Sequence, residues 1–323
     1  MIIIEKLLHT ALLVGLASLA NPAVASAEIL PASASSPSLA AIPVRDHGLV
    51  ATWYPPTSGR KSPAIIVLGG SEGGEEGGQY LGKSIAKHGY GVLSVAYFGA
   101  EGLPANQQEV PLEYFDTALA WLAAQPMVDR KRIGIYGISV GAETALVVAA
   151  RHPEIKAVVA AVPSSVVWQG INMRDFTSIK STYSLAGKPV PFVPYDNSKS
   201  FTSILDLYQR SLAKAVSQDA VIPVERIGGP ILLLSAKDDR MWPSTMMAEQ
   251  VVARLESAGF KPFYEHIAYA DAGHGAMSPP SGDATMAQLD NLGGTKTGNQ
   301  AARMDMWRRV VDFFATSLGK AGK

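Results

Sequence analysis

Residues 133 to 145 read Ile-Gly-Ile-Tyr-Gly-Ile-Ser-Val-Gly-Ala-Glu-Thr-Ala. A β-branched and aromatic run gives way to Gly137-Ile138-Ser139-Val140-Gly141, and an alanine-rich helical pattern follows at once. A G-x-S-x-G motif between a strand and a helix is typical of a nucleophile elbow, a strained turn that lifts the serine hydroxyl above a sheet. Glycines keep that turn free of side chains, and the helix points its N–H groups and positive end toward the hydroxyl. Ser139 is therefore the predicted nucleophile.

Buried strands and helices alternate on both sides of this motif. Strands are expected at residues 48–54, 64–68, 91–96, 157–162, 231–235 and 263–268, and helices at 77–88, 112–124 and 304–318. Alternation of this kind requires βαβ crossovers. It predicts an α/β fold whose mostly parallel sheet is covered by helices on both faces, with 48–54 at an edge.

Residues 164–226 interrupt the alternation. They contain Trp168, Tyr183, Phe192, Tyr195 and one helical pattern at 202–216. Ligands of open α/β sheets bind at the carboxyl ends of the strands, and an insertion there would cover the site as a lid. Its aromatic side chains either line an acyl pocket or pack the lid onto the body, and the sequence leaves both readings open.

Composition argues against a nucleic-acid-binding protein and indicates a single large domain. The 323 residues carry no cysteine and a formal net charge of zero, with only 17% charged residues. Without a basic excess to neutralise phosphates, a nucleic-acid partner is not expected. The 47% hydrophobic content suits a single α/β domain of about 250 residues, here placed at 42–320, with extensions.

The N-terminal segment has the features of an export signal. Residues 7–20 form an apolar run shorter than a membrane span, followed by the small-x-small pattern Ala25-Ser26-Ala27. We expect a signal peptide over 1–27 and a flexible Pro/Ser/Ala-rich lead-in over 28–41. The mature protein would be periplasmic or secreted, without stable insertion in a membrane, and an uncleaved anchor is the alternative.

A serine nucleophile needs a base and an acid that orients the base. The strand at 231–235 runs into Asp238 and Asp239, and a carboxylate just beyond a buried strand is where the acid is expected. We favour Asp238, because adjacent residues cannot both face one histidine, and assign Asp239 a solvated or Arg240-paired role. Of the six histidines, His274 alone lies in a glycine-flanked loop after the last strand, and it is the predicted base.

An oxyanion hole needs two backbone N–H groups. Val140, the residue after the nucleophile, supplies one, and the glycine-rich loop at 69–74 is expected to supply the other through Ser71. Such a loop could instead cradle a phosphate. However, no G-K-[ST] follows and the spacing matches neither nucleotide fingerprint.

Taken together, the chain resembles the catalytic domain of the acyl-CoA thioesterase and bile acid-CoA:amino acid N-acyltransferase family, bacterial members above all. The likeness runs from about residue 42 to 318. The matching segments are Val67-Leu68-Gly69-Gly70-Ser71-Glu72-Gly73-Gly74, Ala96-Tyr97-Phe98-Gly99, Pro111-Leu112-Glu113-Tyr114-Phe115, the elbow through Glu143, Gly187-Lys188-Pro189-Val190-Pro191-Phe192, Ile222-Pro223-Val224-Glu225, Asp238-Asp239-Arg240-Met241-Trp242-Pro243-Ser244, Ala272-Gly273-His274 and Gly293-Gly294-Thr295.

The resemblance implies an α/β-hydrolase fold, a triad of Ser139, His274 and Asp238, and acyl-thioester or ester substrates. In the family, amide-forming transferases carry cysteine at the elbow and thioesterases carry serine, so Ser139 indicates water as the acyl acceptor. Two departures stand out. Too few residues separate the expected signal peptide from the first core strand to build the N-terminal β-sandwich domain of the animal enzymes, and an exported protein would rarely meet coenzyme A.

The resulting hypothesis is acyl transfer to water by a serine enzyme that needs neither a metal nor an organic cofactor. A carboxylesterase or dienelactone-hydrolase-like enzyme with the same triad is the main alternative. A penicillin-recognising enzyme is a weaker one, suggested by Ser84-Ile85-Ala86-Lys87, Ser211-Leu212-Ala213-Lys214 and Lys296-Thr297-Gly298, but it lacks the Ser-Asp-Asn partner. A binding protein on a hydrolase scaffold is the third. The oligomeric state is left open.

Overall fold

The computed structural model describes residues 39–172, 174–175, 177–214, 216–280 and 290–320. The predicted signal peptide and most of the predicted lead-in lie outside the described residues. Of the helices that the structure describes, none combines the length and the apolar character needed to cross a membrane.

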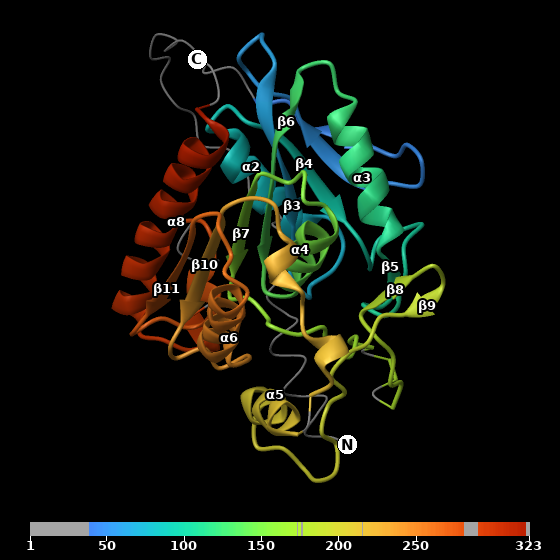
Figure 1. Cartoon of the computed structure of the whole chain (residues 1–323), viewed down its shortest axis with the longest axis vertical. Coiled ribbons are helices and arrows are strands. Elements are labelled where there is room, and N and C mark those ends of the chain that lie inside the picture. The colour runs from blue at the N-terminus through green and yellow to red at the C-terminus, as the bar shows by residue number, and fades with distance from the viewer. Residues whose placement is uncertain (1–38, 173, 176, 215, 281–289, 321–323) are drawn as a thin grey trace, which may run out of the picture.

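An eight-stranded sheet forms the centre of the molecule (Figure 1). Its strands, in spatial order, are β1 (Ile42–Val44), β2 (Val50–Tyr54), β4 (Gly91–Ala96), β3 (Ser62–Leu68), β6 (Val128–Ile138), β7 (Ala157–Ala161), β10 (Ile231–Ala236) and β11 (Tyr264–Tyr269). From β4 to β11 all neighbours are parallel, whereas β1 pairs antiparallel with β2, and β2 pairs antiparallel with β4. The prediction of a mostly parallel sheet is therefore confirmed.

Helices cover both faces of this sheet. The helices are α2 (Glu76–Ala86), α3 (Glu113–Ala123), α4 (Val140–Arg151), α5 (Ile204–Ala213), α6 (Ser244–Ser257) and α8 (Lys296–Leu318). Alternate residues of β3 enter different cores: Ile66 belongs to the cluster that contains residues of α3, α4 and α6, whereas Ile65 belongs to the cluster that contains residues of α2 and α8. This alternation explains why the strand reads as a continuous apolar run in the sequence.

Two of the differences from the sequence prediction have a visible structural cause. The predicted edge strand at 48–54 is β2, which lies one place inside the sheet because the short strand β1 pairs along its outer side. The closing helix begins at Lys296 instead of at residue 304. The Thr295 side chain caps its start by accepting a hydrogen bond from the Gly298 N–H. The cap satisfies an N–H that the helix itself leaves unpaired.

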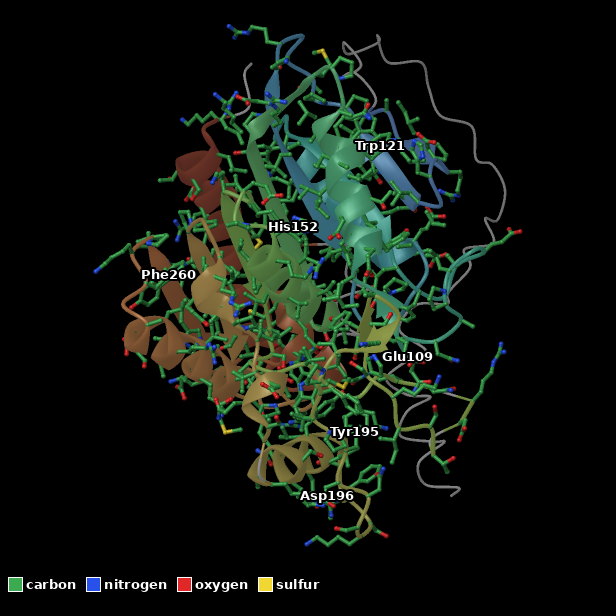
Figure 2. The ribbon with its side chains drawn as sticks, turned by 45° about the vertical axis from the view of Figure 1, so that its right-hand side comes forward. Glu109, Trp121, His152, Tyr195, Asp196 and Phe260 are labelled. Atoms are coloured by element: carbon green, nitrogen blue, oxygen red, sulfur yellow. The ribbon has the colours of Figure 1, made fainter. Side chains whose placement is uncertain are left out.

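Residues 164–226, called here the insertion segment, form a third cluster of buried side chains. Its small strands β8 (Tyr183–Leu185) and β9 (Lys188–Pro189) join β5 (Val110–Pro111) in a separate three-stranded sheet. Trp168 and Tyr208 of this segment pack against Val140 and Trp242 of the body. Helix α5 lies at one end of the molecule, with Tyr195 beside it and Trp121 toward the opposite end (Figures 1 and 2).

Candidate active site

Ser139 lies at a sharp turn between β6 and α4. Its backbone has φ 58° and ψ −125°, a left-handed conformation that is rare outside glycine. The Ser139 N–H donates to the Ala161 carbonyl of β7 at 2.9 Å, which anchors the turn to the sheet. A strained residue held by its surroundings is the expected geometry of a nucleophile elbow.

The two glycines of the motif are required by close backbone contacts. A Cβ at Gly137 would lie 1.9 Å from the Gly141 carbonyl oxygen. A Cβ at Gly141 would lie 2.3 Å from the Gly69 oxygen and 2.5 Å from the Leu68 oxygen. Only glycine fits either position, because no Cβ approaches a backbone oxygen so closely. The elbow therefore packs directly against the loop that follows β3.

His274 joins Ser139 to a buried carboxylate. Its Nε2 lies 2.9 Å from Ser139 Oγ, and its Nδ1 lies 2.9 Å from Asp239 Oδ2. An ionised carboxylate can only accept, so Nδ1 carries the hydrogen and Nε2 is left to accept from the serine hydroxyl. Ser139, Asp239 and His274 follow β6, β10 and β11, which are parallel, so one edge of the sheet brings all three together.

Asp239, and not the favoured Asp238, is the acid beside His274. The Asp239 side chain is 2% exposed, and its Oδ1 accepts from the N–H groups of Met241 and Trp242. The Asp238 side chain is 43% exposed and pairs with Arg240. The structure thus exchanges the two roles predicted from the sequence.

The turn after β10 explains the exchange. The Asp238 N–H donates to Ala272, and Asp238 Oδ2 accepts from the Gly294 N–H at 2.8 Å, which directs this carboxylate toward the 293–294 loop. The next residue then faces inward. The hydrogen bond from Arg240 lowers the pKa of Asp238. Its ionised form is therefore held by a surface partner rather than by the histidine.

The loop after β3 contributes another wall of the site. Glu72 is exposed as a residue, but its carboxylate folds back so that Oε1 accepts from the Gly70 N–H at 2.9 Å. A Cβ at Gly77 would lie 1.8 Å from that oxygen. Desolvation of this carboxylate raises the pKa of Glu72, and hydrogen bonds from its own N–H and from Gly70 oppose the rise. The Gly70 N–H is thereby engaged within the loop.

The predicted oxyanion donors Ser71 and Val140 line the same cavity as Ser139. Val140 is the first residue of α4, where backbone N–H groups have no partner within the helix. That the two N–H groups receive an oxyanion stays a prediction.

A buried carboxyl group, for which the sequence predicts no role, lies beneath the elbow. Glu143 lies in the first turn of α4 and is 1% exposed. Its Oε1 accepts a hydrogen bond, at 3.2 Å, from the backbone N–H of Trp168 in the insertion segment. Burial raises the pKa of Glu143 to about 8, although the Trp168 and Tyr183 hydrogen bonds lower it. An acidic residue inside an otherwise apolar run, one turn after the nucleophile, was the signal in the sequence.

The residues behind the penicillin-recognising alternative do not assemble. Lys296-Thr297-Gly298 opens helix α8 instead of lying on a strand. Ser84 and Ser211 lie within α2 and α5, where each hydroxyl donates to a carbonyl one turn earlier, of Tyr80 and Leu207. None of them lines the cavity beside Ser139. In the described part of the chain, no group of three or more His, Asp or Glu side chains is arranged to hold a metal ion.

Comparison with known families decides the relationship. The family model described as "BAAT / Acyl-CoA thioester hydrolase C terminal" matches residues 110–320, and one described as "PET hydrolase-like" matches residues 19–187. The chain belongs to the BAAT / acyl-CoA thioester hydrolase family. The resemblance seen in the sequence motifs is confirmed.

Curated relatives in this family align with most of the chain. Acyl-coenzyme A thioesterase 6 of Mus musculus is 31% identical over 296 residues, which are 88% of this chain and 66% of the relative. Peroxisomal succinyl-coenzyme A thioesterase of Mus musculus is 26% identical, and acyl-coenzyme A thioesterase 1 of Homo sapiens is 29% identical, with 88% and 86% of this chain covered. The chain spans about two thirds of the length of these relatives, 67% and 65% for the last two.

Solved structures identify the fold as that of the α/β hydrolases, as predicted. A protein assigned as a dienelactone hydrolase in Klebsiella pneumoniae superposes with TM-score 0.53 at 19% identity, covering 86% of this chain and 97% of that one. An esterase of Pyrobaculum calidifontis superposes with TM-score 0.51 at 17% identity, covering 85% and 86%. At such identities the likeness concerns the fold of this family member and not its substrate.

Proposed function

We propose that this chain hydrolyses acyl thioesters, with Ser139 as nucleophile, His274 as general base and acid, and Asp239 as the group that orients His274. The observation that carries the proposal is the hydrogen-bonded chain Ser139–His274–Asp239, built on a strained turn and opening on a cavity. The family membership and the names of the curated relatives support a thioester as the substrate.

In the first step Ser139 Oγ bonds to the acyl carbonyl carbon while its proton moves to His274 Nε2. The oxyanion would be stabilised by the N–H groups of Val140 and Ser71, and one such donor is worth about a hundredfold to a thousandfold in rate. When the tetrahedral intermediate collapses, the carbon–sulfur bond breaks and His274 gives its proton to the thiolate. The Asp239 carboxylate stabilises the transient imidazolium and keeps Nδ1 protonated.

A water molecule then repeats the attack on the acyl-enzyme. His274 Nε2 takes one water proton as the oxygen bonds to the acyl carbon, and returns it to Ser139 Oγ as the ester bond to the enzyme breaks. The products are a carboxylic acid and the regenerated enzyme. An oxygen ester would pass through the same steps with an alkoxide leaving group, so an esterase of the dienelactone-hydrolase type is the second candidate, consistent with the fold.

Hydrolysis of one acyl group attached to three different leaving groups distinguishes a thioesterase from an esterase. We would measure kcat/KM for three butanoyl substrates, butanoyl-coenzyme A, the butanoyl thioester of N-acetylcysteamine and 4-nitrophenyl butanoate, with the wild-type protein and with Ser139→Ala. Preference for both thioesters supports the thioesterase, whereas preference for the oxygen ester supports the esterase. Loss of about 10⁴-fold or more is expected for the variant. Full activity of Ser139→Ala, or no hydrolysis together with no fluorophosphonate labelling of Ser139, would sink the proposal and favour a binding protein.

A further inference from the structure

A cavity of about 120 Å³ lies between Ser139 and the insertion segment. Residues of the elbow, of α5 and of the turn after β10 share its wall. Its lining side chains are mostly apolar or aromatic: Val140, Ile171, Tyr195, Phe201, Ile204, Leu207, Tyr208, Met241 and Trp242. The cavity therefore offers an apolar group a place next to the nucleophile.

Four aromatic rings pack against one another beside this cavity. The Tyr208 ring meets Trp168, Tyr195 and Trp242 edge-on, with centroid distances of 4.8, 5.4 and 5.6 Å. Trp242 in turn meets the His274 ring at 5.9 Å. Trp168, Tyr208 and Trp242 are all buried. Edge-to-face pairs in a close-packed cluster resist displacement, so a longer ligand cannot easily push these rings aside.

We propose that this cavity binds the acyl group and limits it to a short or single-ring, uncharged acyl chain. The proposal rests on the proposed function of Ser139. An engineered cavity of about 150 Å³ in another protein holds one benzene molecule. A volume of about 120 Å³ accordingly holds an acyl chain of about four to six carbons, or one small ring, and the further carbons of a fatty acyl chain would extend beyond the cavity.

The charge on the wall indicates an uncharged acyl group. Asp175 is the one charged residue among the described residues that line the cavity. Its Oδ1 accepts from the N–H and the hydroxyl of Thr177, and these bonds lower the pKa of Asp175. Burial keeps the Tyr195 and Tyr208 phenols neutral by raising their pKa values, to about 12 for Tyr208. An acyl chain that ends in a carboxylate would find no cation among the described residues of this wall, and the one charge there, on the exposed Asp175, has the same sign.

A chain-length series on one leaving group tests the inference. We would measure kcat/KM for N-acetylcysteamine thioesters of acetyl, butanoyl, hexanoyl, octanoyl, dodecanoyl, benzoyl and succinyl groups, always against Ser139→Ala. We expect a maximum at butanoyl to hexanoyl, with dodecanoyl and succinyl at least about tenfold lower. A Ser139-dependent maximum at dodecanoyl, or succinyl equal to butanoyl, overturns the inference and leaves the proposed function intact. Absence of any Ser139-dependent hydrolysis would instead defeat the proposed function.

Substitutions at two positions assign the selectivity to the cavity wall. Tyr208→Ala enlarges the cavity and should raise the octanoyl-to-butanoyl ratio about tenfold, whereas Tyr208→Phe, which keeps the ring and removes only the hydroxyl contact to Tyr195, should leave it unchanged. Ile204→Trp fills the half-buried side of the cavity and should lower the ratio, a test that does not depend on Tyr208→Ala folding. Unchanged ratios in Ile204→Trp and in folded Tyr208→Ala would overturn the assignment of this cavity to the acyl group.

Discussion

In the described part of the chain, two serine–histidine pairs have almost the same hydrogen bond. Ser139 Oγ lies 2.9 Å from His274 Nε2, and Ser235 Oγ lies 2.7 Å from His266 Nε2. The first serine lies at a left-handed turn on the wall of the cavity, whereas the second lies within strand β10 and is 0% exposed. A short hydrogen bond to histidine therefore does not by itself make a serine reactive.

The partners beyond the hydrogen bond separate the two pairs. His274 Nδ1 faces the Asp239 carboxylate, while the second neighbour of Ser235 is the Thr245 hydroxyl. Burial lowers the pKa of His266. With no carboxylate hydrogen-bonded to His266 among the described residues, and with Ser235 fully buried away from any substrate, the second pair serves to hold β10, β11 and α6 together.

Among the substitutions that test this comparison, we expect replacement of Asp239 to have the largest effect. Asp239→Asn is expected to lower kcat about 10⁴-fold, because the amide favours the wrong histidine tautomer. Asp238→Asn, one residue away, is the matched control and should change kcat less than about threefold, since its partners are Arg240 and Gly294. Measured kcat values with the same effect in both variants, or a larger effect in Asp238→Asn, would contradict the assignment.

The buried carboxyl beneath the first pair predicts a pH dependence of stability. The pKa of Glu143 is raised from 4.5 to about 8, so the folded protein keeps a proton that the unfolded chain has lost. Its contribution to the free energy of unfolding is complete below pH 4.5 and is lost as the pH rises toward 8.

The shift corresponds to about 4 kcal/mol over that interval. Glu143→Gln should flatten the decline of the free energy of unfolding between pH 5 and pH 8, as measured by urea denaturation. Glu256→Gln, at an exposed position of α6, is the control and should keep the slope of the wild type. Identical slopes in all three proteins would show that Glu143 is not the group responsible.

The smallest expected effect concerns the second pair. Ser235→Ala removes the hydroxyl that joins His266 and Thr245, and should lower the free energy of unfolding by about 1–3 kcal/mol. Its kcat/KM should stay within about twofold of wild type, because it touches none of the reacting groups. A loss of activity comparable to that of Ser139→Ala would remove the distinction between the two pairs.

Local patterns predicted much of this site. The glycines around Ser139 and the buried strands before and after it specify a strand–turn–helix unit through steric requirements between near neighbours. The position of His274 after the last strand followed from the same logic. The choice between Asp238 and Asp239 could not, because it depends on which carboxylate the Gly294 N–H and the Arg240 side chain hold away from the histidine.

By itself, the sequence determined the α/β architecture, the family and two of the residues that meet at the carboxyl edge of the sheet, Ser139 and His274. The architecture follows from apolar periodicity, the family from motifs that match along the chain, and the two residues from their places after buried strands. Only the tertiary structure decided that Asp239 faces His274 and that Tyr208, Trp242 and α5 confine a small cavity beside Ser139. Both outcomes depend on packing between segments distant in the chain, and such packing leaves no periodic signal in the sequence.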